Sequence, residues 1–116
     1  MDQRRLMRVE GLILEEISRV VVRVLQDPRI EGITLTGVRV SKDLRHARVY
    51  YSTLGDEARQ QECLLGLNSA KGIIKRELAR NLRLRYMPEI EFRFDDSLSY
   101  ADHIQRLLKG LHESGE

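Results

Sequence analysis

The sequence predicts an α+β domain in which helices pack on one face of a three-stranded sheet. Along the chain the apolar residues follow helical spacing, then alternate, then return to helical spacing before a last alternating segment. Three short segments have the β-branched and aromatic composition of strands, and no internal repeat or linker interrupts the 116 residues. The predicted order is α-β-β-α-α-β followed by a C-terminal helix, which gives a sandwich of helices on a sheet.

A first amphipathic helix is predicted over residues 4–26. Its apolar side recurs every three or four positions and consists of Leu6, Val9, Ile13, Ile17, Val20 and Val24. Charged residues occupy the opposite side. Asp27-Pro28 ends the helix, because the residue before a proline is pushed out of helical geometry.

A β-hairpin is predicted next, from residues 33–41 and 46–52, with the turn-forming sequence SKDL between the two strands. The second strand has one apolar face, formed by Ala47, Val49 and Tyr51. The apolar positions of the first strand change phase at Gly37. A β-bulge there would restore the register.

Helical spacing returns at about residue 56 and continues to Pro88, which closes the segment. Gly72 divides this region into two apolar faces, formed by Leu64, Leu67 and Ala70 and by Ile74, Leu78 and Leu82. Glycine in a helix interior costs about 0.5–1 kcal/mol relative to alanine. We therefore expect a kink at this glycine, which would let the two faces point in different directions.

The last two elements are a strand over residues 89–94 and a C-terminal helix. Ile90, Phe92 and Phe94 face inward on the strand, and Ser97 or Ser99 caps the helix. The predicted buried side of this helix is Leu98, Ala101, Ile104, Leu107, Leu108 and Leu111. We expect a single domain over residues 1–112 and a frayed tail over residues 113–116.

Positive charge is concentrated in residues 71–86, which carry a net charge of +5, whereas the rest of the chain carries −3. The cations of this segment are Lys71, Lys75, Arg76, Arg80, Arg83 and Arg85. Arg76, Arg80 and Arg83 have the spacing of one helix face. The kink would leave backbone N–H groups free beside the two lysines, and such groups attract phosphate. The segment therefore predicts contact with a nucleic-acid backbone.

Other interpretations remain open at this point. A single glycine in a helix can be a tight packing point, and arginines on one helix face can be a solvated surface. The basic helix could instead dock on an acidic protein, which would make the domain a protein-interaction module without RNA binding. Weaker candidates for phosphate contact are Arg4, Arg5 and Arg8.

Catalytic and metal chemistry is not indicated. Apolar runs are too short to span a bilayer, no export signal is recognisable, and the single Cys63 cannot form an internal disulfide, so we expect a cytoplasmic protein. Asp95 and Asp96 precede the C-terminal helix, where capping explains them better than a metal or acid–base site with His103. We expect no enzyme activity, catalytic residue, metal or cofactor.

The chain resembles the ribosome-binding factor A family, bacterial factors for late maturation of the small ribosomal subunit, over nearly its whole length. The motifs are VRVSKDLRHARVYYS (residues 38–52), NSAKGIIKRELARNLRLRYMPEIEFRFDDS (68–97) and HIQRLL (103–108). The resemblance implies a type II KH-like fold, α-β-β-α-kink-α-β. No two glycines are three positions apart, so the GxxG loop of KH domains is missing. The family's Ala-x-Gly kink corresponds to Ala70-Lys71-Gly72.

The same resemblance implies a function in ribosome biogenesis. A factor of this family binds the free 30S subunit and its 16S rRNA near the 5′-terminal helix and the decoding region, aids processing and late maturation, and matters most in the cold. It implies no catalysis. We expect a monomer that binds neither membranes nor small-molecule substrates, with contacts mainly to RNA backbone and shape. A KH-like domain acting on another RNA is a further alternative.

Overall fold

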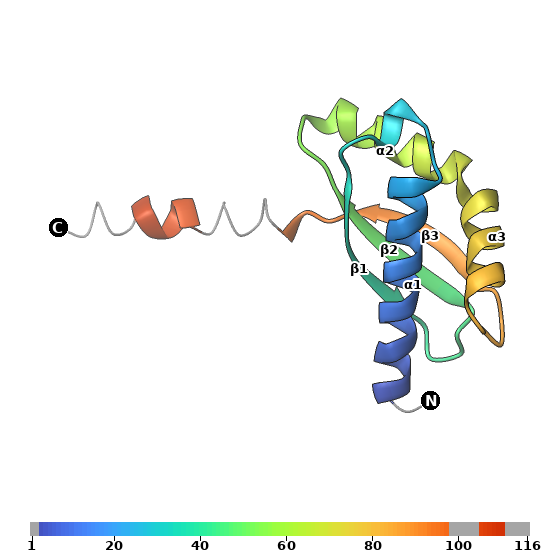
Figure 1. The fold of residues 1–116 in the computed structure, drawn as a ribbon. Helices are drawn as coiled ribbons and strands as arrows, with labels where there is room; N and C mark the ends of the chain where they lie inside the picture. Colours follow the sequence, from blue (N-terminus) through green and yellow to red (C-terminus); the bar gives the residue numbers. More distant parts are fainter. Residues whose placement is uncertain (1–2, 98–104, 111–116) are drawn as a thin grey trace.

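The computed structural model describes residues 3–97 and 105–110, and its elements follow the predicted order (Figure 1). They are α1 (Gln3–Arg23), the 3-10 turn η1 (Pro28–Ile30), β1 (Thr34–Val40), β2 (His46–Ser52), α2 (Glu57–Ser69), α3 (Lys71–Asn81) and β3 (Glu89–Phe94). Side chains from the three strands and from α1, α2 and α3 meet in one hydrophobic core. The predicted α+β class with a three-stranded sheet is confirmed.

The sheet has the order β1-β2-β3 and mixes two kinds of pairing. β1 and β2 form the predicted antiparallel hairpin, with Val38 opposite Val49. The register shifts between Leu35 and Gly37, which confirms the predicted bulge. β3 runs parallel to β2 and places Phe92 beside Val49. Parallel neighbours need a crossover connection, and α2 and α3 supply it.

α1 contributes the buried residues Ile13, Ile17 and Val20, as its apolar stripe predicted. The helix ends at Arg23, and Val24 is 38% exposed, so the predicted burial of Val24 is wrong. The chain leaves the helix early because Asp27 caps the following turn. Its carboxylate accepts a hydrogen bond from the N–H of Arg29 at 2.9 Å.

The long helical region breaks at Ala70, two residues before the glycine that was expected to divide it. Ala70 has φ −91° and ψ 0°, and its N–H donates to the carbonyls of Gly66 and Leu67 at 3.2 and 3.1 Å. Its carbonyl accepts from the N–H of Ile74 at 2.9 Å. Both helices therefore share this one residue, and Gly72 lies inside the first turn of α3.

α3 ends at Asn81, and the helix does not continue to Pro88 as predicted. Leu82 has φ −119° and ψ 145°, which is extended backbone. Leu82 and Leu84 are both partly buried against the core, with the two-residue spacing of an extended segment. The residues 82–88 thus form an irregular connector between α3 and β3.

α2 approaches η1 closely at Gly66. A Cβ atom at this position would lie 2.7 Å from Cγ2 of Ile30 and 3.1 Å from Cβ of Arg29, so only glycine fits without a shift. The guanidinium of Arg59 donates to the carbonyls of Arg29 and Glu31 at 2.9 and 2.6 Å. These contacts fix the start of α2 against η1, and Cys63 of α2 is fully buried.

The C-terminal segment is helical over residues 105–110. Leu107 and Leu108 are 52% and 60% exposed, so their predicted burial is wrong. The core-facing side of the sheet is already covered by α1, α2 and α3, which leaves no apolar face for them. Ser99, His103 and the remaining predicted core residues of this helix (Leu98, Ala101, Ile104 and Leu111) lie outside the described residues, as does the tail 113–116. Among the described helices, none is long and apolar enough to cross a membrane.

Candidate nucleic-acid interface

One side of α3 packs on the core, and the residues on its other side, called here the outer side, include Arg76 and Arg80. Ile74 and Leu78 are fully buried in the core, and Glu77 between them is only 9% exposed. The Glu77 carboxylate accepts hydrogen bonds from Arg19 of α1 and from the side-chain amide of Asn81, both at 3.2 Å. The helix is therefore held in one rotation about its axis, which leaves Arg76 and Arg80 exposed and Lys71 and Lys75 half-buried.

Glu16 of α1 completes this junction. Its Oε1 accepts from Arg19 at 2.7 Å and from Asn81 at 2.7 Å. The hydrogen bond from Arg19 holds the pKa of the Glu16 carboxyl below its usual value, and Asn81 adds to that effect. The same hydrogen bond raises the pKa of Arg19. Two carboxylates and one guanidinium thus connect α1 to α3.

The four predicted cations on α3 differ in their acidic neighbours. Lys71 and Arg76 have no ion-pair partner in the part of the chain that the structure describes. Lys75 lies 3.2 Å from a glutamate of β3, and Arg80 lies 3.8 Å from the glutamate one turn before it. Exposed pairs of this kind contribute at most about 1 kcal/mol, so a polyanion can compete for both cations.

Arg83 and Arg85 lie beyond the end of α3, in the connector 82–88. The predicted helix face shared by three arginines is therefore wrong for Arg83, because the helix ends at Asn81. Arg83 is exposed and has no ion-pair partner within residues 3–97 and 105–110. The guanidinium of Arg85 lies 5.4 Å from the ring centre of Tyr86.

The backbone at the first turn of α3 is accessible at Gly72. No side chain caps this helix at Ala70. Gly72 is exposed, and a Cβ atom built there would meet no atom within 4 Å. Phosphate oxygens can therefore approach the first N–H groups of the helix without a steric barrier, close to Lys71.

One cation next to the predicted set was missed. Arg45 follows the hairpin turn, and its guanidinium lies 4.8 Å from the ring centre of Tyr86. The two residues meet because β3 pairs with β2, and the N–H of Glu89 donates to the Arg45 carbonyl at 2.8 Å. The contact between Arg45 and Tyr86 depends on the pairing of β2 with β3, which local sequence patterns do not predict.

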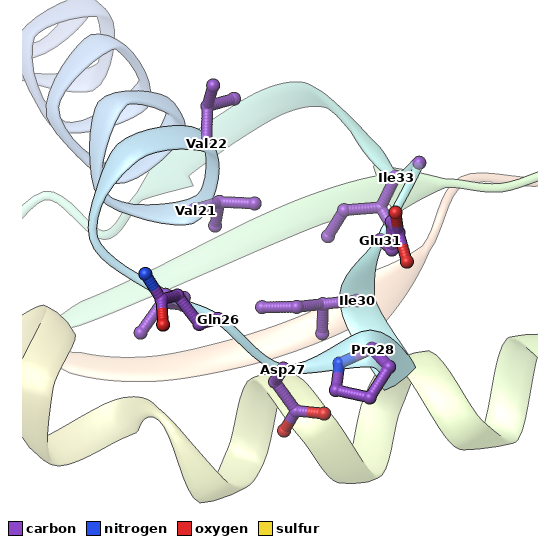
Figure 2. Close-up of a pocket in the computed structure, with 10 residues that line it drawn as sticks. Val21, Val22, Gln26, Asp27, Pro28, Ile30, Glu31 and Ile33 are labelled. Carbon is purple, nitrogen blue, oxygen red and sulfur yellow. The ribbon is translucent and has the colours of Figure 1, made fainter.

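A hollow at the other end of α1 has a different character. Figure 2 shows Val21 and Val22 of α1 across from Ile30 and Ile33. The polar side chains in its lining are Gln26, Asp27 and Glu31, and the lining contains no lysine or arginine. Asp27 is paired with Arg29 at 2.6 Å, and the lining offers no cation to a nucleic-acid backbone, so the cationic side of α3 is the better candidate interface.

The mixed sheet, the order of its elements and the two helices joined at a one-residue break define a KH-like α+β domain. In KH domains the junction between two helices holds a nucleic-acid backbone. Here that junction is Ala70, with Lys71 and Gly72 following it and no GxxG loop.

The chain belongs to the ribosome-binding factor A family, whose sequence profile matches residues 5–108. It is 44% identical over 110 residues to ribosome-binding factor A of Geobacter metallireducens, covering 93% of each chain. It is 48% identical over 105 residues to the Dictyoglomus thermophilum protein of the same name, covering 90% of this chain and 88% of that protein.

Solved structures of the family share the fold. The crystal structure of ribosome-binding factor A from Thermus thermophilus matches with a TM-score of 0.69 and 28% identity, over 77% of this chain and 93% of that one. A homology model of the Thermus thermophilus factor, fitted into a cryo-EM map of its complex with the 30S subunit, matches with a TM-score of 0.58 and 30% identity, over 78% of this chain and 91% of that one. The KH-like fold and the family are therefore confirmed.

Proposed function

We infer that this protein is an RNA-binding assembly factor that binds the free 30S ribosomal subunit and assists late maturation and processing of 16S rRNA near its 5′-terminal helix. Family membership supports the ribosomal partner, since a related factor was fitted into a map of a 30S complex. The observation that carries the RNA contact is the outer side of α3, where Lys71 and Arg76 have no acidic partner in the described residues.

The proposed contact surface consists of Lys71, Lys75, Arg76, Arg80, Arg83 and Arg85. The cations and the open N–H groups at the start of α3 bind phosphates, which position the domain without reading bases. With about 4 phosphate contacts, the logarithm of the association constant falls against the logarithm of salt concentration with a slope near −3. The factor acts as a cytoplasmic monomer without catalysis, and it matters most in the cold, when RNA refolds slowly.

A pair of charge-matched double variants tests this function. Lys71→Glu with Arg76→Glu reverses two cations of the proposed surface, and Arg23→Glu with Arg39→Glu reverses two exposed arginines elsewhere. None of the four has an ion-pair partner in the described residues. Both variants lower the net charge equally, so a difference between them reports position and not overall charge.

The measurement is binding to purified free 30S subunits at several salt concentrations. The first variant should lose affinity by at least tenfold and show a flatter salt dependence, while the second should bind nearly as the parent does. Protein-free 16S rRNA should compete for binding. Equal binding by both variants would reject the proposed surface, and failure of the RNA to compete would favour an acidic protein partner.

A further inference from the structure

A second cluster of cations lies at the end of the domain away from the junction at Ala70. Arg45 and Arg85 hold their guanidinium groups over the same ring, 4.8 and 5.4 Å from the centre of Tyr86. They come from the hairpin turn and from the connector after α3. Figure 1 shows both segments at the end of the molecule where α1 begins. All three side chains are exposed, with Tyr86 at 39%.

The backbone fixes the position of Arg45 from both sides. Leu44 before it has φ 63°, a left-handed conformation that is unfavourable for leucine. Leu44 keeps this conformation because its N–H donates to the Ser41 carbonyl at 2.9 Å and its side chain packs against the core. On the other side, the Arg45 carbonyl accepts from the N–H of Glu89 at 2.8 Å. The turn therefore directs Arg45 toward Tyr86.

The carboxylate of Asp43 lies beside this cluster and accepts a hydrogen bond from the backbone N–H of Arg45 at 3.1 Å. Neither Arg45 nor Arg85 has an ion-pair partner within the described ranges. Both guanidinium groups contact the ring of Tyr86, at 4.8 and 5.4 Å from its centre. The ring attracts each of them through its π face and holds both in place. Each guanidinium group is thus held in place while its N–H groups can still donate to a phosphate.

The geometry favours a polyanion over a small anion. Beside the cluster lies a narrow, mainly apolar cavity, whose lining includes Val9 and Leu84 together with Arg85 and Tyr86 of the cluster itself. It is too narrow to enclose a charged ligand. Both arginines of the cluster are exposed, and Arg83 is exposed in the same connector as Arg85. α3 is about 16 Å long, so its N-terminal junction and this cluster contact different nucleotides of one RNA.

We propose that Arg45 extends the proposed contact surface: together with Arg85, and positioned by the ring of Tyr86, it forms a second phosphate-binding site for the RNA backbone, at the end of α3 opposite the junction at Ala70. The proposal rests on the proposed function and adds one contact to it. Arg45 and Tyr86 are then binding and positioning residues, respectively, and the domain holds its RNA at both ends of α3.

The test uses the full chain with purified free 30S subunits and protein-free 16S rRNA. Arg45→Gln removes one charge of the cluster, and Arg39→Gln is the control, since Arg39 is an exposed arginine without an ion-pair partner in the described residues. Tyr86→Leu removes the aromatic ring without changing the charge, and Tyr86→Phe retains the ring. Tyr86→Trp adds a single tryptophan to a chain that has none, which gives a fluorescent reporter at the cluster.

We expect Arg45→Gln to weaken subunit binding about tenfold and to reduce the salt slope by about 0.7–0.9, whereas Arg39→Gln should do neither. Tyr86→Leu should also weaken binding and reduce the slope although it removes no charge, and Tyr86→Phe should bind as the parent does. In the Tyr86→Trp variant, emission should change when RNA is added. This set of results would support the second site.

Three results would overturn it. If Arg45→Gln and Tyr86→Leu bind like Arg39→Gln while the Lys71 and Arg76 reversals abolish binding, α3 alone contacts RNA and only this proposal fails. If the reversals on α3 also leave binding unchanged, the proposed function fails with it. If the cluster variants lose subunit binding but 16S rRNA neither competes nor changes the tryptophan emission, the partner of the cluster is a protein.

Discussion

Gly66 and Gly72 both lie in helices, but the space around them differs. Gly66 is buried where α2 crosses η1, and an added Cβ would come within 2.7 Å of Ile30. Gly72 is exposed, and an added Cβ would meet nothing within 4 Å. The sequence pattern drew attention to Gly72, because cations and a change of apolar face follow it. It gave no sign of Gly66, since close approach to η1 depends on tertiary packing.

Replacing Gly66 with alanine should destabilise the domain. The new methyl group would overlap Cγ2 of Ile30, and overpacking of this kind costs about 1–3 kcal/mol, more than the gain in helix propensity of about 0.5–1 kcal/mol. Denaturant unfolding of Gly66→Ala should show a lower midpoint than the parent. An unchanged or higher midpoint would contradict this prediction and would mean that η1 moves to accommodate the methyl group at little cost.

Replacing Gly72 with alanine should have the opposite effect on stability. The methyl group meets no neighbour, so the free energy of unfolding should rise by about 0.5–1 kcal/mol through helix propensity and a less flexible unfolded chain. Subunit binding should weaken, because the methyl group stands over backbone that is open to phosphate. A variant that is more stable and also binds as the parent does would show that RNA does not approach this backbone.

The contact between α1 and α3 combines apolar packing with a small polar network. Ile13, Ile17 and Ile74 are buried in the core, while Glu16 and Arg19 link the helices at its edge. The helical periodicity of α1 predicted the apolar part of this contact. The polar part was not predicted, because it needs the relative rotation of two helices.

Stability should fall in acid, and Glu16 should contribute to the fall. Its pKa in the folded state is lowered from 4.5, first by the hydrogen bond from Arg19. A lowered carboxyl pKa adds stability above the unfolded value and loses it as pH falls through the folded value. The free energy of unfolding should therefore decrease as pH drops below about 4.5. It should decrease less steeply in Glu16→Gln, and identical pH curves for variant and parent would contradict the role of this carboxyl.

Two boundaries show why helix ends were harder to predict than helix faces. Pro88 was expected to close the second helical region, but α3 ends at Asn81. Leu82 fits the helical pattern of Ile74 and Leu78 in the sequence, yet Leu82 and Leu84 pack on the core from an extended segment. Short apolar runs satisfy both periodicities, so only the space left by the core decides between them.

Cations are concentrated along α3 and its connector, although Lys75 and Arg80 there lie beside Glu89 and Glu77. The basic part could be predicted from sequence, because the six cations of residues 71–86 are close together in the chain. The contribution of Arg45 could not, because the parallel pairing of β2 and β3 brings it from a distant segment. The arrangement of the strands therefore adds Arg45 to a basic surface of which the sequence shows only residues 71–86.

The position of β3 affects when this protein can fold during its own synthesis. β1 and β2 can form as soon as the hairpin has left the translating ribosome, but Ile90 and Phe92 are still missing from the core. β3 joins the sheet beside β2 only after both crossover helices have been made. The nascent chain therefore remains incomplete until Phe94 emerges from the exit tunnel, and a truncated product ending before β3 would carry the basic helix without a stable domain to hold it.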